Sequence, residues 1–138
     1  MKSACTSTLK LFLWIVCISH LIIGGLGIMP FFSISDVAAT VYKAKIIPSA
    51  QLEHVSRMLA GYMFITGILA FLAIRDPLKN VAIIYGVIGL LSIRVIQMIS
   101  FSREAFNVFD IPPYWYWGQA ILFFVLVLGL FFFRPKEG

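Results

Sequence analysis

Apolar residues fill four separate segments of the chain, and each segment is long enough to form a membrane-spanning helix. A spanning helix needs about 20 apolar residues, because each helical residue advances about 1.5 Å and the hydrocarbon core is about 30 Å thick. Four segments meet this requirement: about Leu11–Met29, Val55–Ile74, Val81–Phe101 and Tyr114–Phe133. The connections between them are mostly short, which favours antiparallel neighbours. The pattern therefore predicts an all-α protein, a single integral membrane four-helix bundle over residues 1–138 with short loops.

The connections contain start and stop signals for helices. Pro30 is expected to close the first span, and Ser35 to cap a short amphipathic stretch that lies along the membrane surface or packs as a connector. Asp76 is expected to cap the third span, with Pro77 at its first position. Four aromatic residues, Tyr114–Trp117, open the last span and are typical of an interfacial belt that sets the depth of a helix.

Composition and charge favour a membrane protein and oppose a nucleic-acid partner. Hydrophobic residues make up 61% of the chain and charged residues 12%, with a mean hydropathy of +0.98, so a soluble fold could not bury the apolar surface. The net charge of +5 comes from basic residues that flank the spans without clustering. One side of the membrane would carry Lys2, Lys10, Arg75, Lys79, Arg134 and Lys136. The other would carry Lys43, Lys45 and Arg103, with Arg57 at its boundary. This difference predicts that both termini are cytoplasmic. We expect a multi-pass protein surrounded by the lipid of a bacterial inner (cell) membrane.

Arg94 is the most informative polar residue, because it lies inside an otherwise apolar span. An ionisable group at membrane depth costs about 3 kcal/mol on insertion scales, so it normally faces a protein interior with a partner. Projection at about 100° per residue groups the polar and small residues of each span into a stripe. The stripes are His20, Gly24 and Gly27; Glu53, Arg57 and Gly61; Gly86, Gly89, Ile93, Gln97 and Ser100, with Arg94 at the edge; and Trp115, Gln119 and Leu126. Because small residues let membrane helices approach closely, we expect these stripes to face inward.

Depth along the helices brings several of these polar residues to a similar level. Counted from the cytoplasmic ends of their spans, Arg94 lies roughly 20 Å up and Gln97 roughly 24 Å. Gln119 lies roughly 8 Å below the outer end of the last span. The pattern therefore predicts a polar cleft of cationic character that opens to the outer half of the membrane. The predicted ligand-binding residues are Arg94, Gln97 and Gln119, with His20 near the middle and Arg57 and Glu53 at the outer rim.

Two interpretations of Arg94 remain open. In the first, Arg94 ties the bundle together through hydrogen bonds to Gln97, Gln119 and backbone carbonyls. In the second, Arg94 and Arg57 bind the anionic or carbonyl-bearing headgroup of a lipid, an isoprenoid or a quinone. The second interpretation would make the chain a binding protein for a lipid-like or quinone-like molecule.

The sequence contains no familiar catalytic or metal-binding pattern. Its two histidines, His20 and His54, show no ligand spacing, and there are only six acidic residues. No nucleophile elbow, phosphate loop or paired-carboxylate site occurs. We therefore predict no catalytic residue and no metal site, and we identify no cofactor. A binding protein is favoured over an enzyme. Two alternatives remain: an accessory subunit of a larger membrane complex, and a membrane enzyme or redox subunit acting on a lipophilic substrate, with His20 or Glu53 as proton carrier.

Short motifs in three spans resemble those of the DUF4345-type small membrane proteins. They are Gly24-Gly25-Leu26-Gly27 before Pro30, Arg57-Met58-Leu59-Ala60-Gly61, and Leu90-Leu91-Ser92-Ile93-Arg94. The resemblance covers about Leu9 to Phe133, and that group is similar in outline to the DoxX-like four-helix proteins. It implies a four-helix membrane bundle, with Arg57, Gly61 and Arg94 at the matching positions, and little about activity. DoxX-like relatives are associated with quinone-linked redox membrane complexes, which slightly favours a quinone-like ligand.

Overall fold

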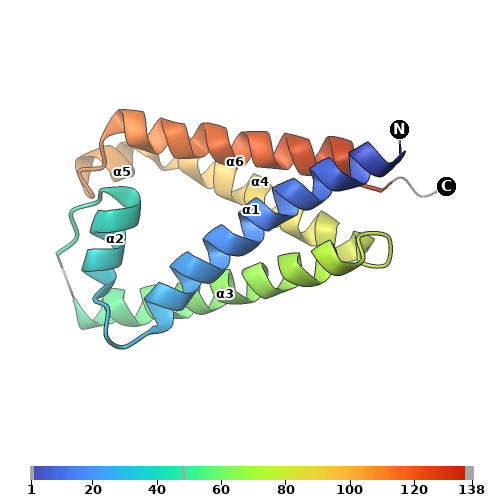
Figure 1. Cartoon of the computed structure of the whole chain (residues 1–138). Helices are drawn as coiled ribbons and strands as arrows, with labels where there is room; N and C mark the ends of the chain where they lie inside the picture. Colours follow the sequence, from blue (N-terminus) through green and yellow to red (C-terminus); the bar gives the residue numbers. More distant parts are fainter. Residues whose placement is uncertain (1, 48, 136–138) are drawn as a thin grey trace.

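The computed structural model describes residues 2–47 and 49–135, with side chains from residue 6 onward. This part of the chain forms six helices and no strand, which confirms the all-α prediction (Figure 1). The helices are α1 Lys2–Ile28, α2 Ile34–Tyr42, α3 Ala50–Arg75, α4 Val81–Ser100, α5 Ser102–Asn107 and α6 Pro113–Phe133. Two of the basic side chains counted for orientation, those of Lys2 and Lys136, lie outside the described residues.

Four of the helices are long and apolar enough to cross a membrane: Thr6–Ile28 of α1, and the whole of α3, α4 and α6. This confirms the predicted four-helix membrane bundle and makes the chain a multi-pass membrane protein. The predicted boundaries agree except at the starts of α1 and α3, where helix precedes the apolar run. In α3, the Ser49 hydroxyl accepts a hydrogen bond of 3.1 Å from the Leu52 amide and caps a polar first turn. Hydropathy alone does not detect this first turn, because its residues are polar and the turn is stabilised by the cap and not by apolar burial.

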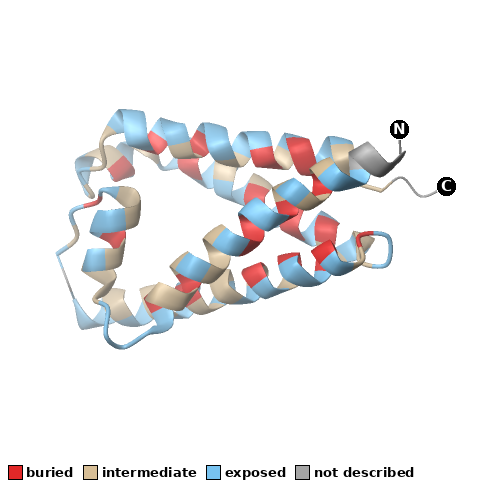
Figure 2. Cartoon of the chain, in the orientation of Figure 1, coloured by how far each residue is buried: buried red, intermediate tan, exposed pale blue. Residues whose placement is uncertain are grey.

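The long helices form two pairs, α1 with α3 and α4 with α6, which meet at one end of the bundle and separate toward the other (Figure 1). The beginning of α1 and the end of α6 lie at the closed end, here called the terminal end. At the opposite end, here called the α2 end, α2 lies across the opening between the pairs. The most deeply buried side chains gather toward the terminal end (Figure 2). Leu13, Ala73, Ile84 and Leu130 are 0% exposed there, so the tight core leaves the α2 end more open.

Glycine allows α1 and α3 to pack with their backbones nearly in contact. An ideal Cβ at Gly24 would lie 2.5 Å from the backbone nitrogen of Phe64 and 2.8 Å from the Ala60 carbonyl oxygen. A Cβ at Gly27 would lie 2.5 Å from that of Ala60. On the α3 side, Gly67 accommodates Leu21 in the same way, with 2.9 Å from its ideal Cβ to the Leu21 nitrogen. The prediction that the glycine stripe of α1 faces inward is therefore confirmed.

The corresponding prediction for α3 and α4 is wrong. An ideal Cβ at Gly61, Gly86 or Gly89 would have no other atom within 4 Å, so these glycines face away from the bundle. The buried residues of α4 are instead Ile84, Val87, Ile88, Leu91 and Met98. Large apolar side chains make the contact between α4 and α6, and no close backbone approach requires glycine there. Arg94 lies on the same side of α4 as these buried residues, because it falls within about 20° of Val87 around the helix axis.

Two predicted helix caps are also wrong in position. α2 is capped by the hydroxyl of Ser33, which accepts a hydrogen bond of 3.2 Å from the Ser35 amide. Asp76 ends α3, and its carboxylate accepts a hydrogen bond of 3.2 Å from the Lys79 amide in the turn before α4. α4 begins only after Asn80, because this turn continues past the proline that was expected to start the helix.

Candidate ligand-binding cavity

A cavity of about 400 Å³ lies at the α2 end, bounded by α2, the last part of α4, α5 and the first part of α6. Most of its wall is apolar, including Ala38, Ile46, Phe101, Phe109 and Ile111. Polar atoms come from Tyr42, Arg94, Gln97, Glu104, Tyr116 and Gln119. Pockets for small molecules usually have volumes of about 300–1,000 Å³ and combine an apolar wall with a few polar groups. The structure therefore brings three of the predicted residues, Arg94, Gln97 and Gln119, to one cavity of suitable size.

Arg94 presents its guanidinium to this cavity without a charged partner. It is exposed, whereas Leu91 and Met98, on the same face of α4, are 2% and 5% exposed. Its Cζ atom lies 5.9 Å from the centre of the Tyr42 ring, within the range of a cation–π contact. Among the described residues it makes no ion pair and no hydrogen bond. The hydrogen bonds to Gln97 and Gln119 that the first interpretation requires are therefore not formed.

Glu104 is a cavity residue that the sequence analysis missed. It belongs to α5, which follows α4 after a break at Phe101, and it lines the cavity. The residue follows the predicted span by three positions and lies outside every predicted element. The one feature of the sequence that could have indicated Glu104 as a cavity residue is its position as an acidic residue close to the end of the span that carries Arg94. Only the turn into α5 places Glu104 on the same cavity as Arg94.

Gln119 and Trp115 fasten α2 to α6. The Gln119 amide and the Trp115 indole each donate a hydrogen bond of 3.0 Å to the Val41 carbonyl. Val41 lies in the last turn of α2, where carbonyls have no partner within the helix. Gln119 thus has a structural contact as well as a place in the cavity wall. Trp115 was predicted as part of an interfacial belt, and the structure adds this specific hydrogen bond inside the protein.

A second aromatic residue of the predicted belt also bonds within the protein. Tyr116 is 8% exposed and donates a hydrogen bond of 2.7 Å from its hydroxyl to the Met98 carbonyl. Tyr114 and Trp117 are 77% and 41% exposed, as an interfacial belt requires. The four aromatic residues therefore divide between two that hold the α2 end together and two that face outward.

Lys45 and Asp110 close the rim of the cavity. The Lys45 ammonium donates a hydrogen bond to the Asp110 carboxylate and forms an ion pair with it, and the Lys45 amide donates one of 2.8 Å to the Phe109 carbonyl. The hydrogen bond and the charge of Asp110 raise the pKa of Lys45 above its ordinary value. These contacts join the segment after α2 to the segment before α6, which limits how far the opening between the helix pairs can widen.

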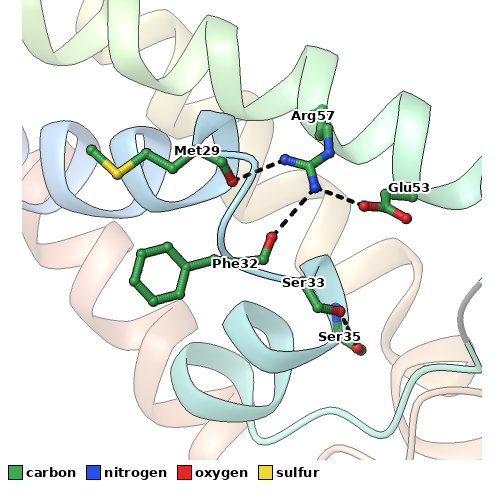
Figure 3. Close-up of polar contacts among 6 residues, drawn as sticks. All are labelled: Met29, Phe32, Ser33, Ser35, Glu53 and Arg57. Atoms are coloured by element: carbon green, nitrogen blue, oxygen red, sulfur yellow. Dashed lines mark hydrogen bonds and ion pairs between the residues drawn. The ribbon is translucent and has the colours of Figure 1, made fainter.

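Arg57 and Glu53 lie away from the cavity and stabilise the end of α1 (Figure 3). The Arg57 guanidinium donates hydrogen bonds of 3.0 Å to the Met29 carbonyl and 3.4 Å to the Phe32 carbonyl. It also forms an ion pair of 2.7 Å with the Glu53 carboxylate. These carbonyls belong to the loop that follows α1, where the Met29 carbonyl also accepts a hydrogen bond of 3.4 Å from the Phe32 amide. The structure thus uses Arg57 to hold the loop after α1 on α3, and it does not bring either residue to Arg94.

His20 is half-buried on α1 and does not line the cavity. Its Nδ1 atom lies 2.9 Å from the Val16 carbonyl oxygen and 3.3 Å from the Ser19 hydroxyl. Because a carbonyl only accepts, Nδ1 carries a proton in this arrangement. Neither of the predicted proton carriers, His20 and Glu53, therefore contacts the cavity.

The described residues do not assemble a metal site. No three His, Cys, Asp or Glu side chains come together in the part of the chain that the structure describes. The charged groups available to a ligand in the cavity are Arg94 and Glu104, with the amides of Gln97 and Gln119 beside them. This set can hold an organic molecule that has an apolar body and a polar head.

Comparison of the chain with known family models, with curated proteins and with solved structures finds no match. The resemblance to DUF4345-type proteins, with Arg57, Gly61 and Arg94 at its matching positions, therefore stays a prediction.

Proposed function

We propose that this multi-pass membrane protein binds a lipid-like or quinone-like molecule in the cavity at the α2 end, with the polar head of the molecule on Arg94. The observation that carries the proposal is the guanidinium of Arg94, which faces a cavity of about 400 Å³ and has no ion pair or hydrogen bond among the described residues. A cavity of this size takes a headgroup and the adjoining part of an apolar chain, while the rest of the chain stays in the bilayer.

The cost of placing Arg94 within a span supports a binding role. Arg94 lies six residues before Ser100, which is about 9 Å from the end of α4. An arginine at the centre of a spanning helix costs about 2.5–3.5 kcal/mol, and somewhat less toward the end. Each hydrogen bond between a guanidinium and an anionic or carbonyl oxygen returns about 1.5–3 kcal/mol. A ligand oxygen therefore offsets a cost that the protein alone compensates only through the contact of Arg94 with the Tyr42 ring.

The direction of the cavity in the membrane is part of the same proposal. The terminal end carries Lys10, Arg75, Lys79 and Arg134, and the α2 end carries Lys43, Lys45, Arg57 and Arg103. Lys2 and Lys136 belong to the terminal end by sequence, and Arg57 is occupied by Glu53, so the excess of basic residues favours cytoplasmic termini. The cavity then opens toward the outer leaflet, which we assign to a bacterial inner membrane.

The test is a native mass spectrum of the protein extracted under mild conditions, compared with Arg94→Leu and Arg103→Leu. Arg103 is the matched control, because it is an exposed arginine of the same end that does not line the cavity. We expect a bound small-molecule mass on the native protein and on Arg103→Leu, and its loss from Arg94→Leu. Retention of the same mass by Arg94→Leu contradicts the proposal. If the leucine variant does not fold, Arg94→Gln takes its place, because it removes the charge but keeps a polar side chain, and retention of the same mass by Arg94→Gln contradicts the proposal.

A second candidate function is that of an accessory subunit of a larger membrane complex. The open glycines of α4 favour it, because Gly86 and Gly89 leave room for the close approach of another helix. This candidate predicts that the extracted chain is part of a larger particle and that Gly86→Leu releases it. A stable isolated monomer without other proteins would count against it.

A further inference from the structure

The cavity carries one group of each charge. Arg94 of α4 and Glu104 of α5 both line it, and the titratable side chains beside them are those of Tyr42 and Tyr116. Arg94 and Glu104 do not form an ion pair with each other. The ion pairs of the described residues are Lys45–Asp110, Arg57–Glu53 and Lys79–Asp76. The cavity therefore separates two opposite charges and leaves both available.

We propose that the cavity selects a zwitterionic headgroup, with the anionic part of the head on Arg94 and its ammonium on Glu104. This inference rests on the proposed function, because it names the ligand class of the same cavity. The chemical class is an amphiphile in which a phosphate and a primary ammonium are a few bonds apart, as in a phosphatidylethanolamine headgroup.

Charge complementarity disfavours the simpler ligands. An anion on Arg94 with no positive charge would share the cavity with Glu104, whose negative charge opposes its binding. A cation on Glu104 alone would be repelled in the same way by Arg94. Charged groups at a binding site contribute more to selectivity than to affinity, so the paired charges favour a ligand that carries both. A primary ammonium is preferred over a quaternary one because its N–H groups donate hydrogen bonds to a carboxylate.

The amides beside these charges fit the same ligand. Gln97 and Gln119 line the cavity from α4 and α6 and offer neutral donors and acceptors. Gln119 already uses its amide nitrogen on the Val41 carbonyl, which leaves its side-chain oxygen as an acceptor. Ester and hydroxyl groups that follow a phosphate in a lipid are suitable partners for such amides.

The test measures which lipid the protein keeps. The purified chain is placed in nanodiscs that contain equal amounts of phosphatidylethanolamine and phosphatidylglycerol with the same acyl chains, and the retained lipid is determined by native mass spectrometry. We expect the native protein to prefer phosphatidylethanolamine about tenfold, the effect of one charge-assisted hydrogen bond. Glu104→Gln should lose this preference. Asp36→Asn, which removes an exposed carboxylate of α2 that does not line the cavity, should keep it.

Each outcome separates this inference from the proposed function. If a lipid or quinone is retained through Arg94 but Glu104→Gln leaves the lipid ratio unchanged, the zwitterion inference is overturned and the proposed function stands. If no ligand depends on Arg94, the proposed function itself fails. If Glu104→Gln does not fold, Glu104→Ala takes its place: it also removes the charge and should lose the preference, and an unchanged lipid ratio in Glu104→Ala would overturn the inference.

Discussion

Replacing Gly24 by alanine tests the closest contact of the fold. An added Cβ would lie 2.5 Å from the Phe64 nitrogen and 2.8 Å from the Ala60 carbonyl oxygen, both backbone atoms that cannot rotate away. Ordinary contacts of a Cβ begin near 3.4 Å, so α1 and α3 must separate by about 0.9 Å at this point, the difference between 3.4 and 2.5 Å. A gap of that size removes about a quarter to a half of the dispersion energy of each affected contact.

The expected loss of stability follows from two opposing effects. Overpacking of this kind costs about 1–3 kcal/mol. It falls on the contact between α1 and α3, the most extensive contact between helices in the described part of the chain. Alanine in place of glycine returns at most about 1 kcal/mol of helix propensity. Gly25→Ala is the matched control, because its Cβ would meet only the Phe64 ring at 3.9 Å. Because the gain in helix propensity is common to both variants, Gly24→Ala should be less stable than Gly25→Ala by the overpacking cost alone, about 1–3 kcal/mol.

Thermal unfolding in detergent, followed by circular dichroism, measures this difference. Gly24→Ala should unfold at a clearly lower temperature than the native protein, and Gly25→Ala at the same temperature or a higher one. Gly86→Ala adds a second control, because no atom lies within 4 Å of its ideal Cβ. Equal stability of Gly24→Ala and Gly25→Ala would refute the close approach of α1 and α3.

Three further perturbations test the contacts at the α2 end. Arg57→Leu should lower the free energy of unfolding by about 1–2 kcal/mol, because it removes hydrogen bonds to two loop carbonyls after α1, and unchanged denaturation in detergent would contradict this role. Trp115→Phe removes one of two donors to the Val41 carbonyl, so hydrogen exchange in α2 should accelerate, and unaltered exchange would show that α2 is held by other contacts. The raised pKa of Lys45 means that its bond with Asp110 stabilises the rim fully below the ordinary lysine pKa and is lost as the pH rises through the raised value. The protection of the rim amides, taken relative to their intrinsic base-catalysed exchange at each pH, should fall over that range in the native protein and stay constant in Asp110→Asn.

Three of the residues that line the cavity could be predicted from the pattern of single helices. Arg94, Gln97 and Gln119 were expected at one level, and the structure places all three on one cavity wall. The helix faces were predicted less well, because glycine marks close packing only where two backbones meet. Gly24 meets α3 in this way, while Gly86 faces outward.

The remaining site residues depend on where other segments pass. Arg57 was expected at the outer rim of the same cleft as Arg94, yet its donors are satisfied by Met29 and Phe32 because the loop after α1 crosses the start of α3. Glu104 was not expected at all, because the turn between α4 and α5 decides its position. Neither the contacts of Arg57 nor the position of Glu104 corresponds to a local pattern in the sequence.

The sequence by itself determined the class of the protein, the number of its spans and the presence of an arginine at membrane depth. Those features follow from the length and hydropathy of each segment, which act on one helix at a time. The tertiary structure decided how the two helix pairs separate, which of the two candidate arginines is satisfied, and which acidic residue lines the same cavity as Arg94. These depend on contacts between segments far apart in the chain, where packing and hydrogen bonding between particular atoms set the geometry.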